Sequence, residues 1–342
     1  MTHKLRALPF EIQIENPKSL RVRLARWFRA HGRDLPWRRT HDPYAIMVSE
    51  FMLQQTQVAT VRDYYGRWLA RFPNFVALGA ASEADVLHVW QGLGYYARAR
   101  NLHRAAQEVV AHHGGALPDD LAAITALPGI GRYTAGAIAS FAFNRSTPII
   151  DANIARVLAR LLDLREPIDT TRGSEILWQA AEALLPTRGG RLHNSALMEL
   201  GALVCTPRQP QCLICPVREH CRAKEPESLP VKKPRRKTVE LAENCAWIVN
   251  KGRLLLEQQT GSRWRGLWKL LPLETQTGGS RLLLALEYPF THHRVTLRVF
   301  AGMAPVSMLE AAQKWVPLED IDTMALAAPH RRAIQRLALQ HQ

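Results

Sequence analysis

Glu50 stands in sequence surroundings that would keep a carboxyl group protonated. It is the one charged residue between Asp42 and Arg62. Its neighbours at helical spacing are apolar, namely Ile46, Met47 and Leu53. Burial among apolar side chains raises the pKa of a carboxyl, and a carboxyl that stays protonated near neutral pH can act as a general acid. The alternative is a buried polar residue whose hydrogen bonds are all satisfied.

Asp151 stands in surroundings that favour the opposite protonation state. It follows the apolar run Pro148–Ile150 and opens a helix that begins with Ala152 and Asn153. The amino-terminal end of a helix favours an ionised carboxylate. One acid and one carboxylate are what the cleavage of a glycosidic bond requires. Taken alone, Asp151 is also an ordinary helix N-cap, and only the fold decides whether the two carboxyls meet.

Four cysteines form a compact group with the spacing C-x6-C-x2-C-x5-C: Cys205, Cys212, Cys215 and Cys221. In a reducing compartment such a group indicates metal binding rather than disulfides. Its thiolates could hold zinc or an iron–sulfur cluster. Structural zinc usually takes two short pairs separated by a longer arm, so this single loop favours one 4Fe–4S cluster. Cys245 stands apart and is expected to be a core residue.

The segment Leu127–Ala137, LPGIGRYTAGA, predicts two helices joined by a tight hairpin. Gly129 and Gly131 allow a turn whose backbone N–H groups face outward at the start of the second helix. Such a turn can hold a DNA phosphate without reading sequence. A plain helix-capping turn is an equally good interpretation of this motif alone.

Two further segments have the composition of DNA contacts. Gln55 and Thr56 follow Glu50 by about one helical turn, and Gly92–Arg100 places Tyr95 in a glycine-rich turn before a basic helix. An enzyme that extracts a base from a duplex needs side chains to fill the gap it leaves. Gln55 and Tyr95 could do so. The alternative is exposed glutamines and a tyrosine packed in a loop.

The composition agrees with a nucleic-acid partner. The chain has 342 residues, and 45 Lys and Arg against 30 Asp and Glu give a net charge of +15. A basic excess of this size favours a polyanion. No stretch reaches the ~18 apolar residues of a membrane helix, and the first residues lack the apolar region of a signal peptide. We therefore expect a cytoplasmic location.

The elements that must position these residues fall into two regions and a linker. Residues 1–225 read as mainly helical. The helices are expected over 17–31, 43–61, 83–90, 98–113, 119–127, 132–143, 153–163, 174–185 and 192–204. Residues 226–241 read as a basic, proline-rich linker. Residues 242–342 read as a small α+β domain with strands near 246–249, 254–256, 295–300 and 315–316 and a helix over 329–339.

These motifs together resemble the helix–hairpin–helix DNA glycosylases, and among them the MutY-type adenine DNA glycosylases. The matching segments are Arg33–Arg38, Ser49–Val58, Trp90–Arg100, Leu127–Ala139, Asp151–Asn153 and the four cysteines. Endonuclease III-like relatives carry a catalytic lysine where this chain has Tyr133. The resemblance therefore implies a monofunctional glycosylase that removes adenine mispaired with 8-oxoguanine, and more weakly with guanine, from duplex DNA.

The resemblance also implies a role for each group. Glu50 would protonate adenine and later activate water, Asp151 would stabilise the sugar cation, and Asn153 and Tyr133 would support them. The adenine pocket would comprise Trp37, Arg38, Leu53 and Val58. The residues facing the oxidised guanine would be Gln55, Thr56, Leu93 and Tyr95. The cluster would be structural, and the protein is expected to be a monomer associated with nucleoid DNA.

The carboxy-terminal region resembles the Nudix-like domain of the same family. The matching pieces are Trp264–Trp268, Phe290–His292 and Leu326–His330. In the family the segment equivalent to Phe290, Thr291 and His292 contacts 8-oxoguanine. The glutamate-rich Nudix box is absent, so pyrophosphate hydrolysis is not expected. Residues 273–288 are short for this domain and indicate loss of a helical insert, which we expect to affect 8-oxoguanine discrimination more than catalysis.

Two other functions compete with this interpretation. Within the same fold, the chain could be a glycosylase with lyase activity or with another mismatched base as substrate. Tyr133 argues against the first, and the Gln54-Gln55 and Asp151–Asn153 segments argue against the second. From another class, it could be a non-catalytic iron–sulfur module that binds DNA or senses redox state. An acid on an apolar helix face is costly to keep without a purpose, which disfavours that alternative.

Overall fold

The computed structural model describes residues 14–234, 237–261, 263–273, 280–303 and 309–339. The chain forms two compact units. The first consists of Met1–Tyr65 and Glu108–Pro234, and the second of Gly66–Gln107 and Arg235–Gln342. Residues 66–107 are helical but fold with the carboxy-terminal part of the chain, so the division in space does not follow the sequence order.

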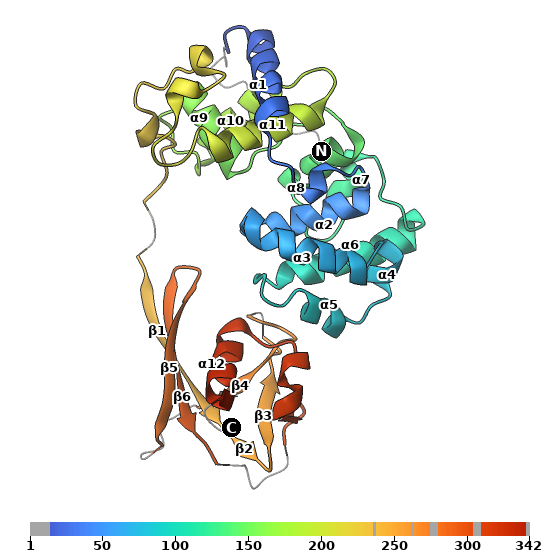
Figure 1. The fold of residues 1–342 in the computed structure, drawn as a ribbon, viewed down its shortest axis with the longest axis vertical. Coiled ribbons are helices and arrows are strands. Elements are labelled where there is room, and N and C mark those ends of the chain that lie inside the picture. Colours follow the sequence, from blue (N-terminus) through green and yellow to red (C-terminus); the bar gives the residue numbers. More distant parts are fainter. Residues whose placement is uncertain (1–13, 235–236, 262, 274–279, 304–308, 340–342) are drawn as a thin grey trace. The chain divides into compact units, whose positions relative to one another are not determined.

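The first unit is helical (Figure 1). Its helices are α1 (Pro17–His31), η1 (Pro36–Arg38), α2 (Pro43–Leu53), the start of α3 (Val58–Arg71), the end of α6 (Ala97–His113), α7 (Leu121–Ala126), α8 (Arg132–Phe143), α9 (Ala152–Leu161), α10 (Thr171–Ala183) and α11 (Gly190–Leu203), followed by the short turns η2 (Cys212–Ile214), η3 (Arg218–His220) and η4 (Pro226–Ser228). No helix in the described ranges combines the length and apolar character needed to cross a membrane.

Local sequence signals explain where these helices begin. The side chain of Asn16 accepts a hydrogen bond from the backbone N–H of Ser19, and Pro17 occupies the first helical position of α1. Asp42 caps α2 in the same way, by accepting from the backbone N–H groups of Tyr44 and Ala45. Capping side chains satisfy N–H groups that have no partner within the helix. These two starts agree with the prediction.

The expected helix over 43–61 is wrong, because the chain breaks it into α2 and α3. α2 ends at Leu53, and Gln55 adopts a left-handed backbone conformation with φ 56°. A left-handed residue cannot continue a right-handed helix. The other expected helices lie within three residues of observed ones. The prediction missed the end of α3 and the short helix α4 (Phe75–Gly79).

The crossing of α9 and α11 depends on a glycine. A Cβ atom at Gly201 would lie 2.6 Å from the Cβ atom of Asn153 and 2.9 Å from its carbonyl oxygen. Only glycine allows this approach without displacing α9. Because α9 begins immediately after Asp151, this contact also sets the position of a predicted site residue.

The second unit combines helices with a seven-stranded sheet. Its helices are the end of α3, α4, α5 (Glu83–Val89), the start of α6 and α12 (Ala328–Leu339), with η5 (Leu318–Thr323). The strands are β1 (Val239–Trp247), β2 (Val249–Asn250), β3 (Arg253–Gln258), β4 (Trp268–Pro272), β5 (Leu282–Phe290), β6 (His293–Ala301) and β7 (Gln313–Pro317). The strand order is β2-β3-β4-β1-β6-β5, and β7 pairs with β3.

β1 and β6 are parallel neighbours, whereas β5 and β6 form an antiparallel hairpin. The expected strands and terminal helix are present, but the prediction missed β4 and β5. Residues 282–288 of the stretch predicted to be short belong to β5, and residues 274–279 lie outside the described part of the chain. Cys245 is fully buried in the core of this domain, as expected.

The turn between β3 and β4 packs on the helices of the same unit. Arg100 Nη1 donates a hydrogen bond to the carbonyl oxygen of Arg265 at 2.8 Å. At Gly266, a Cβ atom would come within 3.4 Å of side-chain atoms of Glu83 and Leu87. The Tyr96 hydroxyl donates to the carbonyl oxygen of Leu326 at 3.4 Å. These contacts attach residues 83–100 to the strand-rich domain.

The close approach at Gly201 predicts that replacing glycine by alanine has opposite effects on stability at Gly201 and at Gly66. Gly201→Ala should lower the free energy of unfolding by ~1–3 kcal/mol, because the added methyl group overlaps Asn153. Gly66→Ala in α3 should raise it by up to ~1 kcal/mol, because no atom lies within 4 Å of the new Cβ and alanine is the better helix former. Urea unfolding of both variants measures this, and equal effects at the two sites would contradict the close approach.

Candidate active site

Glu50 lies within a helix that is buried on all sides. Every residue of α2 from Tyr44 to Met52 is buried, and Glu50 itself is 3 % exposed. Its Oε2 atom accepts a hydrogen bond of 3.1 Å from the hydroxyl of Tyr133 at the start of α8. Burial raises the pKa of Glu50 to about 7, against the lowering effect of the Tyr133 hydrogen bond. The predicted general acid is therefore half-protonated near neutral pH.

Asp151 is the N-cap of α9. Its Oδ1 atom accepts from the backbone N–H of Ile154 at 2.7 Å, and its Oδ2 atom accepts from Asn153 Nδ2 at 2.9 Å. Burial raises the pKa of Asp151, and these hydrogen bonds lower it. The helix amino terminus thus acts in the expected direction, but the net shift is upward because burial outweighs it. The larger upward shift is at Glu50, so the two carboxyls remain an unequal pair.

The fold brings the two carboxyls into one electrostatic environment, which the sequence could not show. The charge of Asp151 raises the pKa of Glu50 in addition to burial. Burial raises the pKa of the Tyr133 hydroxyl well above its usual value, and both carboxylates raise it further. Tyr133 therefore stays a hydrogen-bond donor to Glu50. A protonatable carboxyl, a second carboxylate and a fixed phenol form an arrangement suited to acid-assisted cleavage of a glycosidic bond.

A hydrogen-bonded arginine connects Asp151 to the first cysteine. Arg156 Nη2 donates to Asn153 Oδ1 at 2.8 Å and to the carbonyl oxygen of Gly201 at 2.6 Å, and its Nε atom donates to the carbonyl oxygen of Cys205 at 2.7 Å. Asn153 thus bonds Asp151 on one side and Arg156 on the other. The cysteine loop is therefore linked to the orientation of the second carboxylate.

A small cavity of about 40 Å³ opens beside Glu50. Three of the four residues predicted to form the adenine pocket line it, namely Trp37, Arg38 and Leu53; Val58 does not. The prediction missed the other lining residues, Ile46, Ser49, Phe141, Arg191, Ser195 and Met198. The volume suits a few water molecules rather than a purine, so a base can enter only if the lining side chains move.

Arg38 is held by a residue that the sequence analysis missed. Glu199 in α11 is fully buried and accepts hydrogen bonds from the side chains of both Arg33 and Arg38 at 2.8–2.9 Å. Although burial opposes ionisation, these bonds lower the pKa of Glu199 to about 2. A single carboxylate in the apolar run around Leu197–Leu200 is the signal that could have revealed it, as it did for Glu50.

The residues predicted to bind DNA lie at several places. Gly129 has φ 75° and is exposed with Gly131 in the turn before α8, as a phosphate-binding hairpin requires. Gln55 in the first unit and Tyr95 in the second are exposed and left-handed, with φ 56° and 48°. Thr56 is half-buried, and Leu93 is a core residue of the second unit with 5 % exposure.

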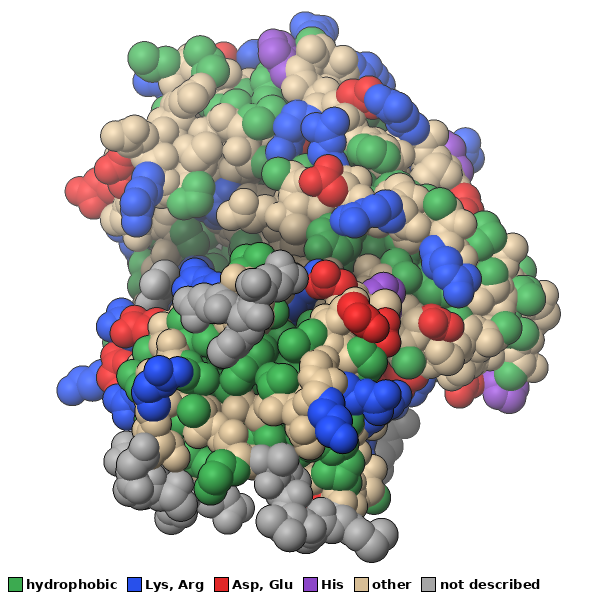
Figure 2. Space-filling view, turned by 60° about the horizontal axis from the view of Figure 1, so that its bottom comes forward, with side chains coloured by type: hydrophobic (Ala, Val, Ile, Leu, Met, Phe, Trp, Pro, Cys, Tyr) green, Lys and Arg blue, Asp and Glu red, His purple; other side chains and the backbone are tan. Residues whose placement is uncertain are grey.

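The last predicted DNA contacts form the turn between β5 and β6. Phe290 and His292 are half-buried, and Thr291 between them is exposed with φ 54°. They belong to the second unit, whereas Glu50 and Asp151 belong to the first. Basic side chains are interspersed with acidic ones over the face shown in Figure 2.

The four cysteines close one loop around η2 and η3 and are each partly buried. Burial, together with the charges of the other three sulfurs, raises the pKa of Cys215 to about 11, so the thiols are electrostatic neighbours. Thiolates ~2.3 Å from one tetrahedral zinc ion would lie ~3.8 Å apart. Within the described residues, the one group of three potential ligand atoms within 4.8 Å of each other is Glu243, Cys245 and His330. No three of the described loop sulfurs meet that spacing.

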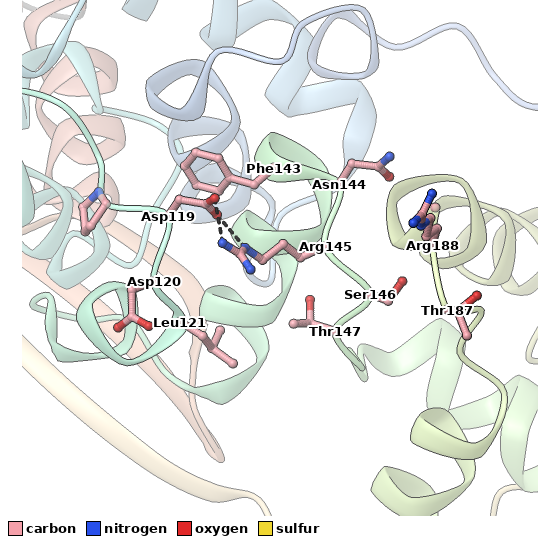
Figure 3. A pocket seen from close by; sticks show the side chains of 12 residues that line it. Asp119, Asp120, Leu121, Phe143, Asn144, Arg145, Ser146, Thr147, Thr187 and Arg188 are labelled. Carbon is pink, nitrogen blue, oxygen red and sulfur yellow. Dashed lines mark hydrogen bonds and ion pairs between the residues drawn. The ribbon is translucent and has the colours of Figure 1, made fainter.

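A wide hollow of about 880 Å³ lies elsewhere in the first unit (Figure 3). Arg145 forms a two-pronged ion pair with Asp119 on one side of it, at 2.7 Å, and Ser146, Thr187 and Arg188 lie on the other. None of the predicted site residues lines this hollow. Its size alone therefore does not make it the candidate active site.

Comparison with known proteins places these features in a family. Residues 48–182 match the HhH-GPD superfamily of base excision DNA repair proteins, and residues 205–221 match the iron–sulfur binding domain of endonuclease III. The chain is 46 % identical over 217 residues to the adenine DNA glycosylase of Homo sapiens, covering 60 % of this chain and 40 % of that protein.

It is also 42 % identical over 202 residues to the adenine DNA glycosylase of Mycolicibacterium smegmatis, covering 59 % of this chain and 68 % of the relative. A solved thermostable thymine-DNA glycosylase aligns with a TM-score of 0.55 and 29 % identity over 61 % of this chain and 96 % of that one. The matching part of the chain spans about half the length of the human, mouse, rat and Buchnera aphidicola adenine DNA glycosylases. The segment that matches the iron–sulfur binding domain contains all four loop cysteines.

The hydrogen bonds of Glu199 with Arg33 and Arg38 predict a pH-dependent contribution to stability. The pKa of Glu199 is about 2 in the folded protein and ~4.3 in an unfolded chain, so ionisation stabilises the fold above pH ~4. Glu199→Gln should lower the free energy of unfolding by ~3 kcal/mol at pH 7, and this deficit should shrink as pH falls from 4 to 2. Urea unfolding of both proteins across this range measures the difference, and a pH-independent deficit would contradict the proposed ionisation.

Proposed function

This chain belongs to the adenine DNA glycosylase family, and we propose that it removes adenine from duplex DNA by hydrolysing the bond between the base and its sugar. The observation that carries the proposal is the buried Glu50, whose pKa is about 7 and which shares its site with Tyr133 and Asp151. This is the acid that a purine leaving group requires, beside the carboxylate that a sugar cation requires.

The reaction follows from the protonation states of the two carboxyls. Glu50 donates its proton to the adenine that has been flipped out of the duplex, and the bond from the base nitrogen to the sugar breaks with its electrons moving to the base. Asp151, oriented by Asn153, stabilises the positive charge on the sugar. Glu50, now ionised, takes a proton from a water molecule that attacks the sugar carbon. The products are free adenine and an abasic site.

The described candidate site offers no lysine amine for a lyase reaction. Position 133 is tyrosine, and the sequence contains no lysine between Lys18 and Lys224. A lyase forms a covalent Schiff base between an amine and the sugar. The described helical unit therefore supports a monofunctional glycosylase, which leaves the DNA backbone intact.

We propose that the base opposite adenine is 8-oxoguanine, or less favourably guanine. The residues assigned to this recognition are Gln55, Thr56, Leu93, Tyr95, Phe290, Thr291 and His292. Gln55, Tyr95 and Thr291 are exposed, whereas Leu93 is buried in the second unit. Gly129 and Gly131 would hold a DNA phosphate at the amino-terminal end of α8. The protein would act as a monomer on chromosomal DNA in the cytoplasm, and its carboxy-terminal domain would be Nudix-like.

The cysteine loop would hold a 4Fe–4S cluster through Cys205, Cys212, Cys215 and Cys221. When bound, the cluster would cross-link the loop and so have a structural role. Arg156 and Arg160 fix the first cysteine: Arg156 bonds its carbonyl oxygen, and Arg160 Nη1 donates to its sulfur at 3.2 Å. The cluster loop thereby stabilises the start of α9, where Asp151 lies.

Glu50→Gln tests the acid. We expect excision of adenine opposite 8-oxoguanine to fall by at least ~100-fold, because general acid–base catalysis contributes ~10²–10⁴-fold. The measurement is strand cleavage of a labelled duplex after alkali, with binding of the same duplex measured in parallel. Glu182→Gln on the exposed face of α10 is the matched control and should leave excision unchanged. Unchanged excision and binding in the Glu50 variant would leave the acid without a role.

The pH profile tests the state of Glu50. The single-turnover rate should fall as pH rises above 7, because the neutral acid disappears. Tyr133→Phe removes the hydrogen bond that lowers the pKa of Glu50, so the falling limb should move to higher pH even if the maximal rate decreases. A limb that stays in place in the variant would show that another group titrates there.

A further inference from the structure

The guanidinium group of Arg263 lies among three aromatic rings of the carboxy-terminal domain. Its Cζ atom is 3.9 Å from the ring centroid of Trp264, 4.3 Å from that of Phe290 and 5.6 Å from that of Tyr288. All three distances are within the range of cation–π attraction. Arg263 therefore contacts the ring that precedes the exposed Thr291.

A carboxylate and a phenol hold the other end of this guanidinium. The Tyr288 hydroxyl donates to Glu243 Oε2 at 2.6 Å and accepts a hydrogen bond from Arg263 Nη2. Arg263 Nη2 also lies 3.6 Å from Glu243 Oε2. Glu243 is in β1, and Tyr288 is in β5, two residues before Phe290. The chain of contacts thus runs from the middle of the sheet to the β5–β6 turn.

Glu243 is kept ionised by its surroundings. Against the effect of burial, hydrogen bonds from His330 and Tyr288 and the charge of Arg263 lower its pKa to about 2. His330 Nδ1 accepts from the backbone N–H of Leu270, so Nε2 carries the proton and faces Glu243 at 3.3 Å. In this tautomer Nε2 presents a hydrogen-bond donor to Glu243, and the same carboxylate lies beside Arg263.

Phe290 connects Arg263 to the β5–β6 turn. Its ring lies against Arg263 and also stacks with His293 at 6.5 Å between centroids. Phe290 and His293 are paired across the hairpin, so Thr291 and His292 alone form its loop. Thr291 is a β-branched residue with φ 54°, a conformation that persists only where the surroundings impose it. The placement of Phe290 therefore decides how Thr291 and His292 are presented.

We propose that Arg263, held by Glu243 and Tyr288, is a positioning residue that fixes the Phe290–Thr291–His292 turn for discrimination of the base opposite adenine. This inference rests on the proposed function. Arg263 belongs to the second unit, whereas Glu50 and the residues that line the cavity beside it belong to the first. Loss of its stacking should therefore reduce the preference for 8-oxoguanine over guanine without slowing excision opposite guanine.

Three substitutions separate stacking, charge and anchoring. Arg263→Gln removes the cation, Arg263→Lys keeps the charge but lacks the planar group that stacks on rings, and Tyr288→Phe removes the hydroxyl that joins Arg263 to Glu243. The matched control is Arg294→Gln. Arg294 in β6 pairs with Glu240 in β1 at 3.4 Å, is exposed, and has no described contact with Phe290.

The first measurement is single-turnover excision of adenine opposite 8-oxoguanine and opposite guanine at one salt concentration. The ratio of the two rates should fall at least fivefold in Arg263→Gln, fall by less in Arg263→Lys and Tyr288→Phe, and stay within twofold of wild type in Arg294→Gln. Excision opposite guanine should stay within twofold throughout. An unchanged ratio in a folded Arg263→Gln protein would overturn the inference, as would an equal loss on both duplexes, which indicates general destabilisation.

The second measurement keeps this test separate from the proposed function. Binding of the two duplexes is compared between Glu50→Gln and the double variant Glu50→Gln/Arg263→Gln, at fixed salt because phosphate contacts dominate affinity. The affinity ratio should fall at least fivefold in the double variant, and an unchanged ratio would overturn the inference. Failure of the wild-type protein to excise adenine would overturn the proposed function, whereas the affinity ratio would still test Arg263.

Discussion

The chemistry depends on the burial of one carboxyl group in a helix that has no exposed face between Tyr44 and Met52. Desolvation raises the pKa of Glu50 to about 7, and Tyr133 and Asp151 adjust it in opposite directions. An acid with this pKa gives and takes a proton at little cost near neutral pH. α8 and α9 must hold Tyr133 and Asp151 against α2, and the small contacts between helices, such as that of Gly201 with Asn153, make this approach possible.

Two buried carboxylates with the opposite behaviour organise the regions around the chemistry. Glu199 and Glu243 both have a pKa of about 2, because each is surrounded by hydrogen-bond donors and at least one arginine. Such groups stay ionised and hold their partners in fixed positions. Glu199 holds Arg38 at the cavity beside Glu50, and Glu243 holds Arg263 against Phe290. The same interaction thus positions side chains in both units. Of these three buried glutamates, Glu50 is the one without an arginine partner, and burial raises its pKa.

The division into two units assigns the chemistry to one and much of the proposed recognition to the other. Residues 66–107 are helical, yet Arg100 and Tyr96 bond the backbone of the strand-rich domain. Leu93 and Tyr95 therefore share a unit with the Phe290–Thr291–His292 turn. In the proposed reaction, binding energy from the recognition residues can contribute to placing adenine at Glu50.

The sequence by itself determined the identity of the chemical groups and most helices. An isolated Glu50 in an apolar run, an N-cap at Asp151 and four close cysteines are local signals, and helix caps and apolar periodicity are local too. Tertiary structure decided what depends on distant residues: the pairing of Glu50 with Asp151, the break at Gln55, the strands β4 and β5, and the role of Glu199. These features depend on burial and on contacts between residues that are distant in the sequence. Desolvation and electrostatic coupling act through space, so no residue spacing in the sequence reveals them.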